Sequence, residues 1–149
     1  MTFSRHGNKA KFRRCARVRV GVMLLLDTSF LIALSAEEDR RQAGAAVAFL
    51  RANPGQQTVV SLVAVGEYLE AVKDVADALR FLRRHTLIGL SMAIARKGAE
   101  LQSRLGQRLG ENDAWLAATA LAHGFTLVTA DHDFARVPRL SYVEFMKAA

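Results

Sequence analysis

Residues 110–134, "GENDAWLAATALAHGFTLVTADHDF", place acidic side chains on both sides of an almost wholly apolar middle. The apolar part that follows Asn112–Asp113 predicts a helix buried in the centre of a domain. Gly124 is a good residue to end that helix, because glycine adopts the left-handed backbone found after helices at little cost. Phe125–Thr129 ("FTLVT") has the continuous apolar character of a strand buried on both faces, and it ends just before Asp131.

Upstream of this unit, short apolar runs alternate with segments of helical periodicity. The runs predicted as strands are Val22–Leu26, Thr58–Leu62, Thr86–Leu90 and, as a last edge strand, Leu140–Phe145. The segments predicted as helices are a helix or helical turn in Asp27–Glu38, and then Arg40–Asn53, Val63–Asp74, Val75–His85 and Met92–Arg108. This alternation predicts an α/β three-layer sandwich, in which helices flank a mostly parallel central sheet of four to five strands.

Individual residues mark where these helices are expected to begin and end. Ser61 and Ser91 each precede a helical segment and can accept a hydrogen bond from a backbone N–H of its first turn. Gly110 is expected to end the helix that starts at Met92. The segment Arg40–Asn53 has an apolar face predicted from four residues at helical spacing: Ala43, Ala46, Val47 and Leu50.

The composition is that of one folded domain without disulfides. The chain has 149 residues, of which 51% are hydrophobic, and this is enough to bury a core. Its single cysteine, Cys15, cannot form a disulfide within the chain, as expected for a protein of the reducing cytoplasm. The apolar runs are too short and broken to predict a membrane span. We therefore expect a cytoplasmic protein with no membrane partner.

The net charge of +7 comes from residues 1–22. They carry seven of the 21 lysines and arginines and none of the 14 acidic residues, so the predicted domain, 23–149, is formally neutral. We interpret 1–22 as a disordered extension or as sequence upstream of the true start. A nucleic-acid-binding arm is a second interpretation, because such a run neutralises phosphates. A signal peptide is disfavoured, because Asp27 and its polar neighbours interrupt the apolar run.

Four acids are predicted to meet at one edge of the sheet. In parallel sheets, ligands bind beyond the carboxyl ends of the strands. Asp27 directly follows the first strand, Asp131 follows the fourth, and Glu67 lies just past the second. Asp113 opens the helix that leads into the fourth strand. Each acid alone is explained as a helix cap, a turn residue or a solvated helix residue, but their joint placement favours a site.

Clustered carboxylates favour a metal-dependent reaction. They repel one another and burial raises their pKa values further, so such a cluster does not stabilise a fold. A divalent cation turns the repulsion into attraction, and carboxylate oxygens suit Mg²⁺ or Mn²⁺. Ions held in this way can activate water and stabilise the oxygens of a phosphoryl displacement. The acids therefore predict phosphodiester hydrolysis.

Four stretches of the chain resemble the PIN-domain family, and more narrowly the toxin ribonucleases of bacterial VapBC toxin–antitoxin modules. They are "LLLDTSFLIAL", "SLVAVGEYLE", "ENDAWLAATALAHGFTLVTADHDFARVP" and "LSYVEF", in matching order over roughly Met23–Phe145. The aspartate after the first strand is weakly specific, whereas the third stretch is much more specific. Residues 1–22 depart from the family, whose chains usually start just before the first strand.

The resemblance implies a PIN-like fold and an endoribonuclease that cuts structured cellular RNA, often tRNA or rRNA. It also implies a homodimer and inhibition by a VapB-type antitoxin whose C-terminal segment covers the site. Four acids match the positions that hold Mg²⁺ or Mn²⁺ in the family, the last of them a more variable position: Asp27, Glu67, Asp113 and Asp131. Thr28 and Thr129 match small hydroxyl residues beside these acids, where they can support the metal ligands.

Two other interpretations of function remain open. Ser91, between a strand and a helix, resembles the nucleophile of an α/β-hydrolase, and acids and histidines follow in the order of that family: Asp113, Asp131 and His132 or His123. However, Ala93 stands where that motif has a second glycine, and the chain is short for that fold. The chain could also be a degenerate PIN-like module that binds RNA or a partner without nuclease activity. Divalent-metal binding that is lost in Asp113→Asn would exclude this second interpretation.

Overall fold

The computed structural model describes residues 16–147, which form a five-stranded sheet in which every neighbouring pair is parallel. The strand order is β3-β2-β1-β4-β5, so β1 is central and the predicted edge position of the last strand is confirmed. The strands are β1 (Leu24–Leu26), β2 (Thr58–Ser61), β3 (Thr86–Ile88), β4 (Thr126–Thr129) and β5 (Tyr142–Glu144).

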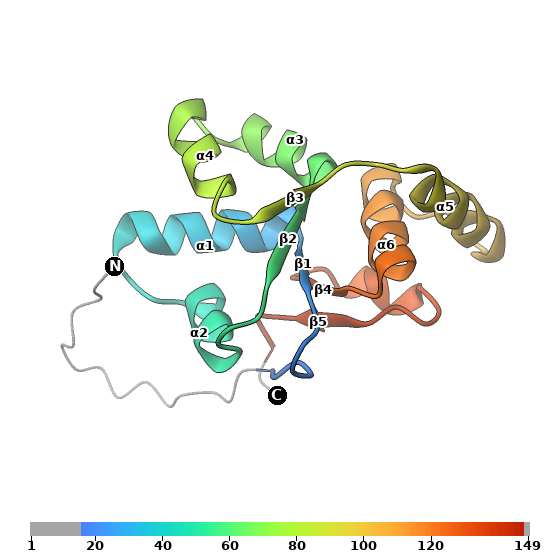
Figure 1. Ribbon diagram of the computed structural model, residues 1–149, viewed down its shortest axis with the longest axis horizontal. Helices are drawn as coiled ribbons and strands as arrows, with labels where there is room; N and C mark the ends of the chain where they lie inside the picture. Colours follow the sequence, from blue (N-terminus) through green and yellow to red (C-terminus); the bar gives the residue numbers. More distant parts are fainter. Residues whose placement is uncertain (1–15, 148–149) are drawn as a thin grey trace.

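Helices flank this sheet and confirm the predicted α/β fold. In Figure 1, α1 and α2 lie on one side of the strands and α5 and α6 lie on the other. The helices are α1 (Thr28–Arg40), α2 (Ala45–Ala52), α3 (Leu62–Ala71), α4 (Val75–Leu82), α5 (Met92–Arg104) and α6 (Glu111–His123), followed by a 3₁₀ helix over His132–Arg136. None of the helices within residues 16–147 has the length and apolar character needed to cross a membrane.

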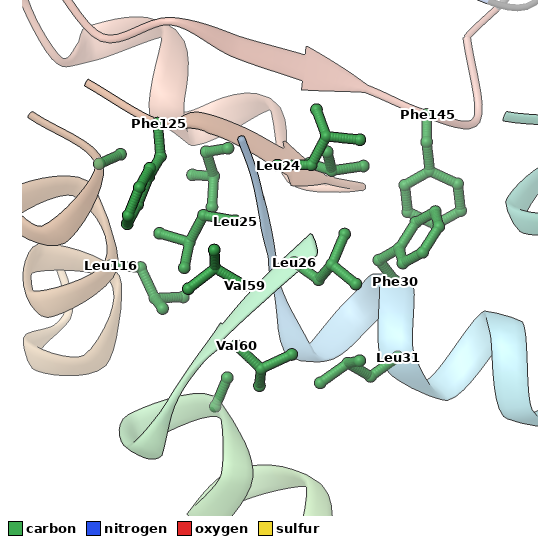
Figure 2. Packing of buried hydrophobic residues seen from close by; sticks show 14 of the residues in the cluster. Leu24, Leu25, Leu26, Phe30, Leu31, Val59, Val60, Leu116, Phe125 and Phe145 are labelled. Atoms are coloured by element: carbon green, nitrogen blue, oxygen red, sulfur yellow. The ribbon is translucent and has the colours of Figure 1, made fainter. Parts of the chain in front are cut away.

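The core is built around β1, whose three leucines have no exposed surface. Helices on both sides of the sheet explain why this strand is apolar at every position rather than at alternate ones. Figure 2 shows the side chains of β1 and β2 between Leu116 of α6 and Phe30 of α1. Phe30 also packs edge-on against Phe145, with 4.9 Å between the ring centroids, and this contact fixes the chain after β5.

Three of the predicted helix ends are confirmed. The hydroxyl of Ser61 accepts the N–H of Val63 at the start of α3, and the hydroxyl of Ser91 accepts the N–H of Ile94 at the start of α5. Gly124 ends α6 with a left-handed φ of 70°. Each serine therefore satisfies one of the backbone donors that the first turn of a helix leaves unpaired.

The predicted end of the fifth helix is wrong. The helix α5 ends at Arg104 rather than near Arg108, and Gly110 precedes α6 instead of ending α5. The side chain of Gln102 explains the difference, because it accepts the N–H and donates to the C=O of Leu109, both at 3.0 Å. These two bonds fold the chain back as a loop.

The second helix and the strands are also shorter than predicted. The helix α2 begins at Ala45, because the carboxylate of Glu37 accepts backbone N–H groups at its start. Ala43 therefore lies outside the helix and is exposed, whereas Phe49 is buried on its inner face. The strand β1 begins at Leu24 rather than at Val22.

Residues 16–22 lie against the domain. The buried side chain of Asn53 bonds the backbone of Ala16 and Val18, and Val18 packs against the core. Of the proposed basic extension, residues 1–15 lie outside the described residues. The boundary predicted at Met23 stays a prediction.

Candidate active site

The carboxyl ends of β1 and β4 bring two of the predicted acids to neighbouring positions. Asp27 follows β1 and precedes α1, and its N–H donates to the C=O of Val128 in β4 at 3.0 Å. Asp131 lies two residues after the end of β4. Because β1 and β4 pair in parallel, both acids lie at the same edge of the sheet.

Asp27 is held by donors on three sides. The residue is 8% exposed. Its carboxylate accepts the hydroxyl of Thr129 at 2.7 Å, the N–H of Thr28 at 2.7 Å and the hydroxyl of Ser29 at 3.3 Å. Burial raises the pKa of Asp27 above its usual value, the three hydrogen bonds oppose this, and the negative charge of Asp131 adds to it. The hydrogen bonds therefore fix the orientation of the carboxyl group, while burial and the charge of Asp131 disfavour its ionised form.

The hydroxyl of Thr129 connects the two acids. It donates to Asp27 and accepts the N–H of Asp131 at 3.0 Å, and Thr129 is completely buried. Thr129, predicted to support the acids, therefore contacts both of them directly. Thr28 contacts Asp27 through its backbone only, and its buried hydroxyl has no hydrogen-bond partner among the described residues.

Ser29 also belongs to this arrangement, although it was not among the residues predicted for the site. Its hydroxyl donates to Asp27 and accepts the N–H of Ala130 at 3.0 Å, so it joins the start of α1 to the loop after β4. The sequence does contain a signal for Ser29, because it is the second of two hydroxyl residues that directly follow Asp27. Only the pairing of β1 with β4 places Ala130 within reach.

Asp113, in the first turn of α6, lies within electrostatic range of the other acids. It is half-buried, and its pKa is raised to about 6. Burial is the largest cause, followed by the negative charges of four acids, in decreasing order Asp27, Asp131, Glu67 and Asp133. Glu67 comes from α3, which packs on α6. The structure therefore brings all four predicted site acids into one electrostatic cluster.

The donor set fits a hard divalent cation. Carboxylate oxygens that repel one another around a buried aspartate suit Mg²⁺ or Mn²⁺, and the unpartnered hydroxyl of Thr28 adds an oxygen beside them. As the side chains stand, no three acidic, histidine or cysteine residues within residues 16–147 form a complete coordination group. Glu67 and Asp113 are only partly buried.

Residues beside the cluster have ordinary partners. Asp133 pairs with Arg136 at 2.8 Å, and this hydrogen bond holds the pKa of Asp133 below its usual value. The Nδ1 atom of His132 lies 3.4 Å from a carboxylate oxygen of Glu144. Ser91 caps α5, as described above, so the structure gives it the role of a helix cap.

Comparison with known proteins identifies the family. The sequence profile of the PIN domain matches residues 24–140. Ribonuclease VapC4 of Mycobacterium tuberculosis is 34% identical over 101 residues, which cover 60% of this chain and 78% of that protein.

Solved structures agree with this assignment. A chain of a toxin–antitoxin complex from Klebsiella pneumoniae is 29% identical, has a TM-score of 0.65, and is matched over 80% of this chain and 95% of that one. VapBC2 from Rickettsia felis, solved with a promoter DNA fragment, has a TM-score of 0.66 at 21% identity, over 82% of this chain and 98% of that one, and shows the shared fold. The chain therefore belongs to the PIN-domain family and, within it, to the VapC group.

Proposed function

We propose that this chain is the toxin of a VapBC-type toxin–antitoxin module and an endoribonuclease that cuts structured RNA, either tRNA or rRNA. The observation that carries the proposal is the cluster of four acids at the carboxyl edge of the sheet, where the pKa of Asp113 is raised to about 6. A PIN relative named as a ribonuclease supports RNA as the substrate.

The four acids would hold the cofactor, which we propose to be Mg²⁺, with Mn²⁺ as a substitute: Asp27, Glu67, Asp113 and Asp131. When bound, such an ion supplies a water molecule of lowered pKa and neutralises charge that develops on the phosphate. The cluster has no need of a protein nucleophile for hydrolysis.

The remaining contacts position these acids. Thr129 and Ser29 hold the carboxylate of Asp27 in one orientation. Thr129 also accepts the backbone N–H of Asp131, so one hydroxyl positions both residues. Ligands oriented by hydrogen bonds lose less freedom on binding an ion. Asp113 holds a proton below about pH 6 and must release it to become a ligand.

We further propose that a VapB-type antitoxin inhibits the chain by covering the acid cluster. Structurally similar chains were solved in toxin–antitoxin complexes, one from Klebsiella pneumoniae and one, VapBC2, from Rickettsia felis. An inhibitor that places a positively charged group at the cluster would relieve the repulsion between the carboxylates, as a metal ion does. A cytoplasmic location follows from this proposal, since the RNA substrate and the antitoxin meet the chain there.

A homodimer is proposed through the open edge of the sheet. The strand β3 is an edge strand, and apolar side chains beside it are 42–76% exposed: Leu62, Leu87, Leu90 and Met92. Exposed apolar groups along an unpaired strand are typical of a protein interface. A charge at this surface should disfavour the dimer.

Light scattering after gel filtration checks the dimer. Leu90→Glu should give a monomer, whereas Val75→Glu on α4, at the same exposure of about half, should stay dimeric. A wild-type chain that is already a monomer at working concentration, or a Leu90→Glu chain that remains a dimer, would contradict this interface.

Induced expression in a bacterial host, with growth followed and RNA 5′ ends mapped, tests the nuclease. Wild type should arrest growth and produce new ends at a few discrete positions. Asp113→Asn should abolish both effects, and Asp39→Asn, an exposed aspartate on α1, should abolish neither. Arrest that survives Asp113→Asn would refute the site. Binding to RNA without new ends would favour the degenerate module that binds and does not cut.

A further inference from the structure

The segment before β1 is built into the domain by one side chain. Asn53, which is 6% exposed, accepts the N–H of Val18 at 2.7 Å through its Oδ1 atom. Its Nδ2 atom donates to the C=O of Ala16 and to the C=O of Phe49, both at 2.9 Å. A buried amide with three partners holds the backbone on each side of Arg17 in place.

A cavity of about 450 Å³ opens between this segment and the sheet. Its lining contains two exposed arginines, two hydroxyl residues and no acid: Arg17, Val18, Arg19, Val22, Gly124, Thr126, Ser141 and Val143. The hydroxyls of Thr126 and Ser141 are 3.0 Å apart, and either can be the donor. The cavity lies where β4 and β5 begin, at the edge of the sheet opposite to the acid cluster.

We propose that this cavity binds the phosphate backbone of RNA. Guanidinium groups bind phosphate through paired N–H donors, and hydroxyl groups are common further donors to phosphate oxygens. The preceding sequence continues the positive charge, with five basic residues and no acid in residues 1–15: Arg5, Lys9, Lys11, Arg13 and Arg14. The proposal rests on the proposed function only for its choice of RNA over other polyanions.

The position of the cavity restricts the substrate. Strands of three or four residues span about 10–13 Å, so the two edges of the sheet are close together on the scale of a folded RNA. One RNA can therefore place phosphates in the cavity and a scissile bond at the acids. Helices cover the sheet between the two sites, so an RNA has to pass around the domain to contact both. The arrangement therefore favours a substrate many nucleotides long.

Equilibrium binding of poly(U) RNA, measured in EDTA at several salt concentrations, tests the proposal. The double substitution Arg17→Gln and Arg19→Gln should weaken binding about 10-fold or more at 0.1 M salt. It should also reduce the slope of log K against log salt by about 1.4, at 0.7 for each lost phosphate contact.

The matched control is Arg40→Gln with Arg83→Gln, which removes two exposed arginines, one at the end of α1 and one directly after α4, and changes the net charge equally. This pair should leave the slope nearly unchanged. Equal losses from both double variants would show that RNA responds to net charge alone, and the cavity would then be refuted.

The variant Asn53→Ala distinguishes two explanations of RNA binding: a cavity formed by the docked segment, and a basic tail that binds without being docked. It keeps every arginine but removes the bonds that place Arg17, so it should weaken RNA binding while the circular dichroism spectrum stays native. Unchanged affinity in this variant would overturn the docked cavity. No cleavage can interfere in EDTA, so a chain that fails to cut RNA in cells leaves this result standing.

Discussion

Thr129 is the residue on which the orientation of two acids depends. Its single hydroxyl is used twice, as a donor to Asp27 and as an acceptor from the backbone of Asp131. A buried carboxylate that loses a donor is destabilised by the full cost of its missing partner. We therefore predict that Thr129 contributes to both stability and function.

We predict that Thr129→Val reduces the free energy of unfolding by about 1–3 kcal/mol, because the buried Asp27 loses its 2.7 Å donor. It should also reduce RNA cleavage by roughly 10–100-fold, the usual effect of losing a group that orients a metal ligand. Urea denaturation and a cleavage assay measure the two effects. The control is Thr119→Val in α6, a fully buried threonine whose hydroxyl bonds the C=O of Trp115. Cleavage should be unaffected there, and equal losses in both variants would remove Thr129 from the site.

The folded structure disfavours the ionised form of Asp113. Its pKa is raised to about 6 by burial and by its acidic neighbours, so between about pH 4 and pH 6 the folded chain binds a proton that the unfolded chain has released. Its contribution to stability is therefore present at low pH and is lost as the pH rises through 6. At neutral pH the ionised carboxyl destabilises the metal-free fold.

Asp113→Asn should accordingly stabilise the protein in EDTA at pH 7.5, by on the order of 1 kcal/mol once solvent screening of this half-exposed group is allowed for. The gain should shrink towards zero at pH 4. Urea denaturation at the two pH values measures it. A variant that is less stable than wild type at pH 7.5 would contradict the electrostatic repulsion between Asp113 and the neighbouring acids.

At the scale of elements, a carboxylate joins α1 to α2. Glu37, near the end of α1, is buried and accepts the N–H groups of Gly44, Ala46 and Val47. Gly44 has to be small, because a Cβ atom there would lie 2.9 Å from the Cδ atom of Glu37. The side chain thus supplies the N-terminal cap that the sequence of α2 lacks.

Glu37→Gln should lower the free energy of unfolding by about 1–3 kcal/mol, because an amide accepts these N–H groups more weakly than a carboxylate and turns its own N–H₂ towards them. Its neighbour Glu38 pairs with Arg84 at the surface, and Glu38→Gln should cost less than about 1 kcal/mol. Chemical denaturation of the two variants side by side checks this. Equal effects would mean that the buried bonds do not hold α2.

Element types were predictable from the sequence, but their ends were less so. The buried strands and the helix α6 follow from local apolar patterns, and Ser61 and Ser91 act on their own first turns. The early end of α5 depends on the side chain of Gln102 reaching Leu109. The late start of α2 depends on Glu37. Hydrogen bonds between a side chain and backbone groups several residues away produce no recognisable pattern in the local sequence.

At the scale of the whole molecule, parallel pairing of β1 and β4 explains why distant acids meet. The sequence predicted this edge because the acids follow buried strands, and topology does the rest. Ser29 and the clasp of Asn53 on residues 16–18 were not predicted, since each is a polar residue whose partner is set by the completed fold. The edge of the sheet where the acids lie could be predicted from the sequence, but the hydrogen bonds between separate elements could not.

Binding of Mn²⁺, followed through the electron paramagnetic resonance signal of the free ion, is the most direct test of the acid cluster as a metal site. We predict saturable binding to wild type and to Asp39→Asn, and binding at least about 10-fold weaker to Asp113→Asn, which removes a ligand charge but preserves shape. The same affinity in all three proteins, or no binding to wild type, would contradict the site.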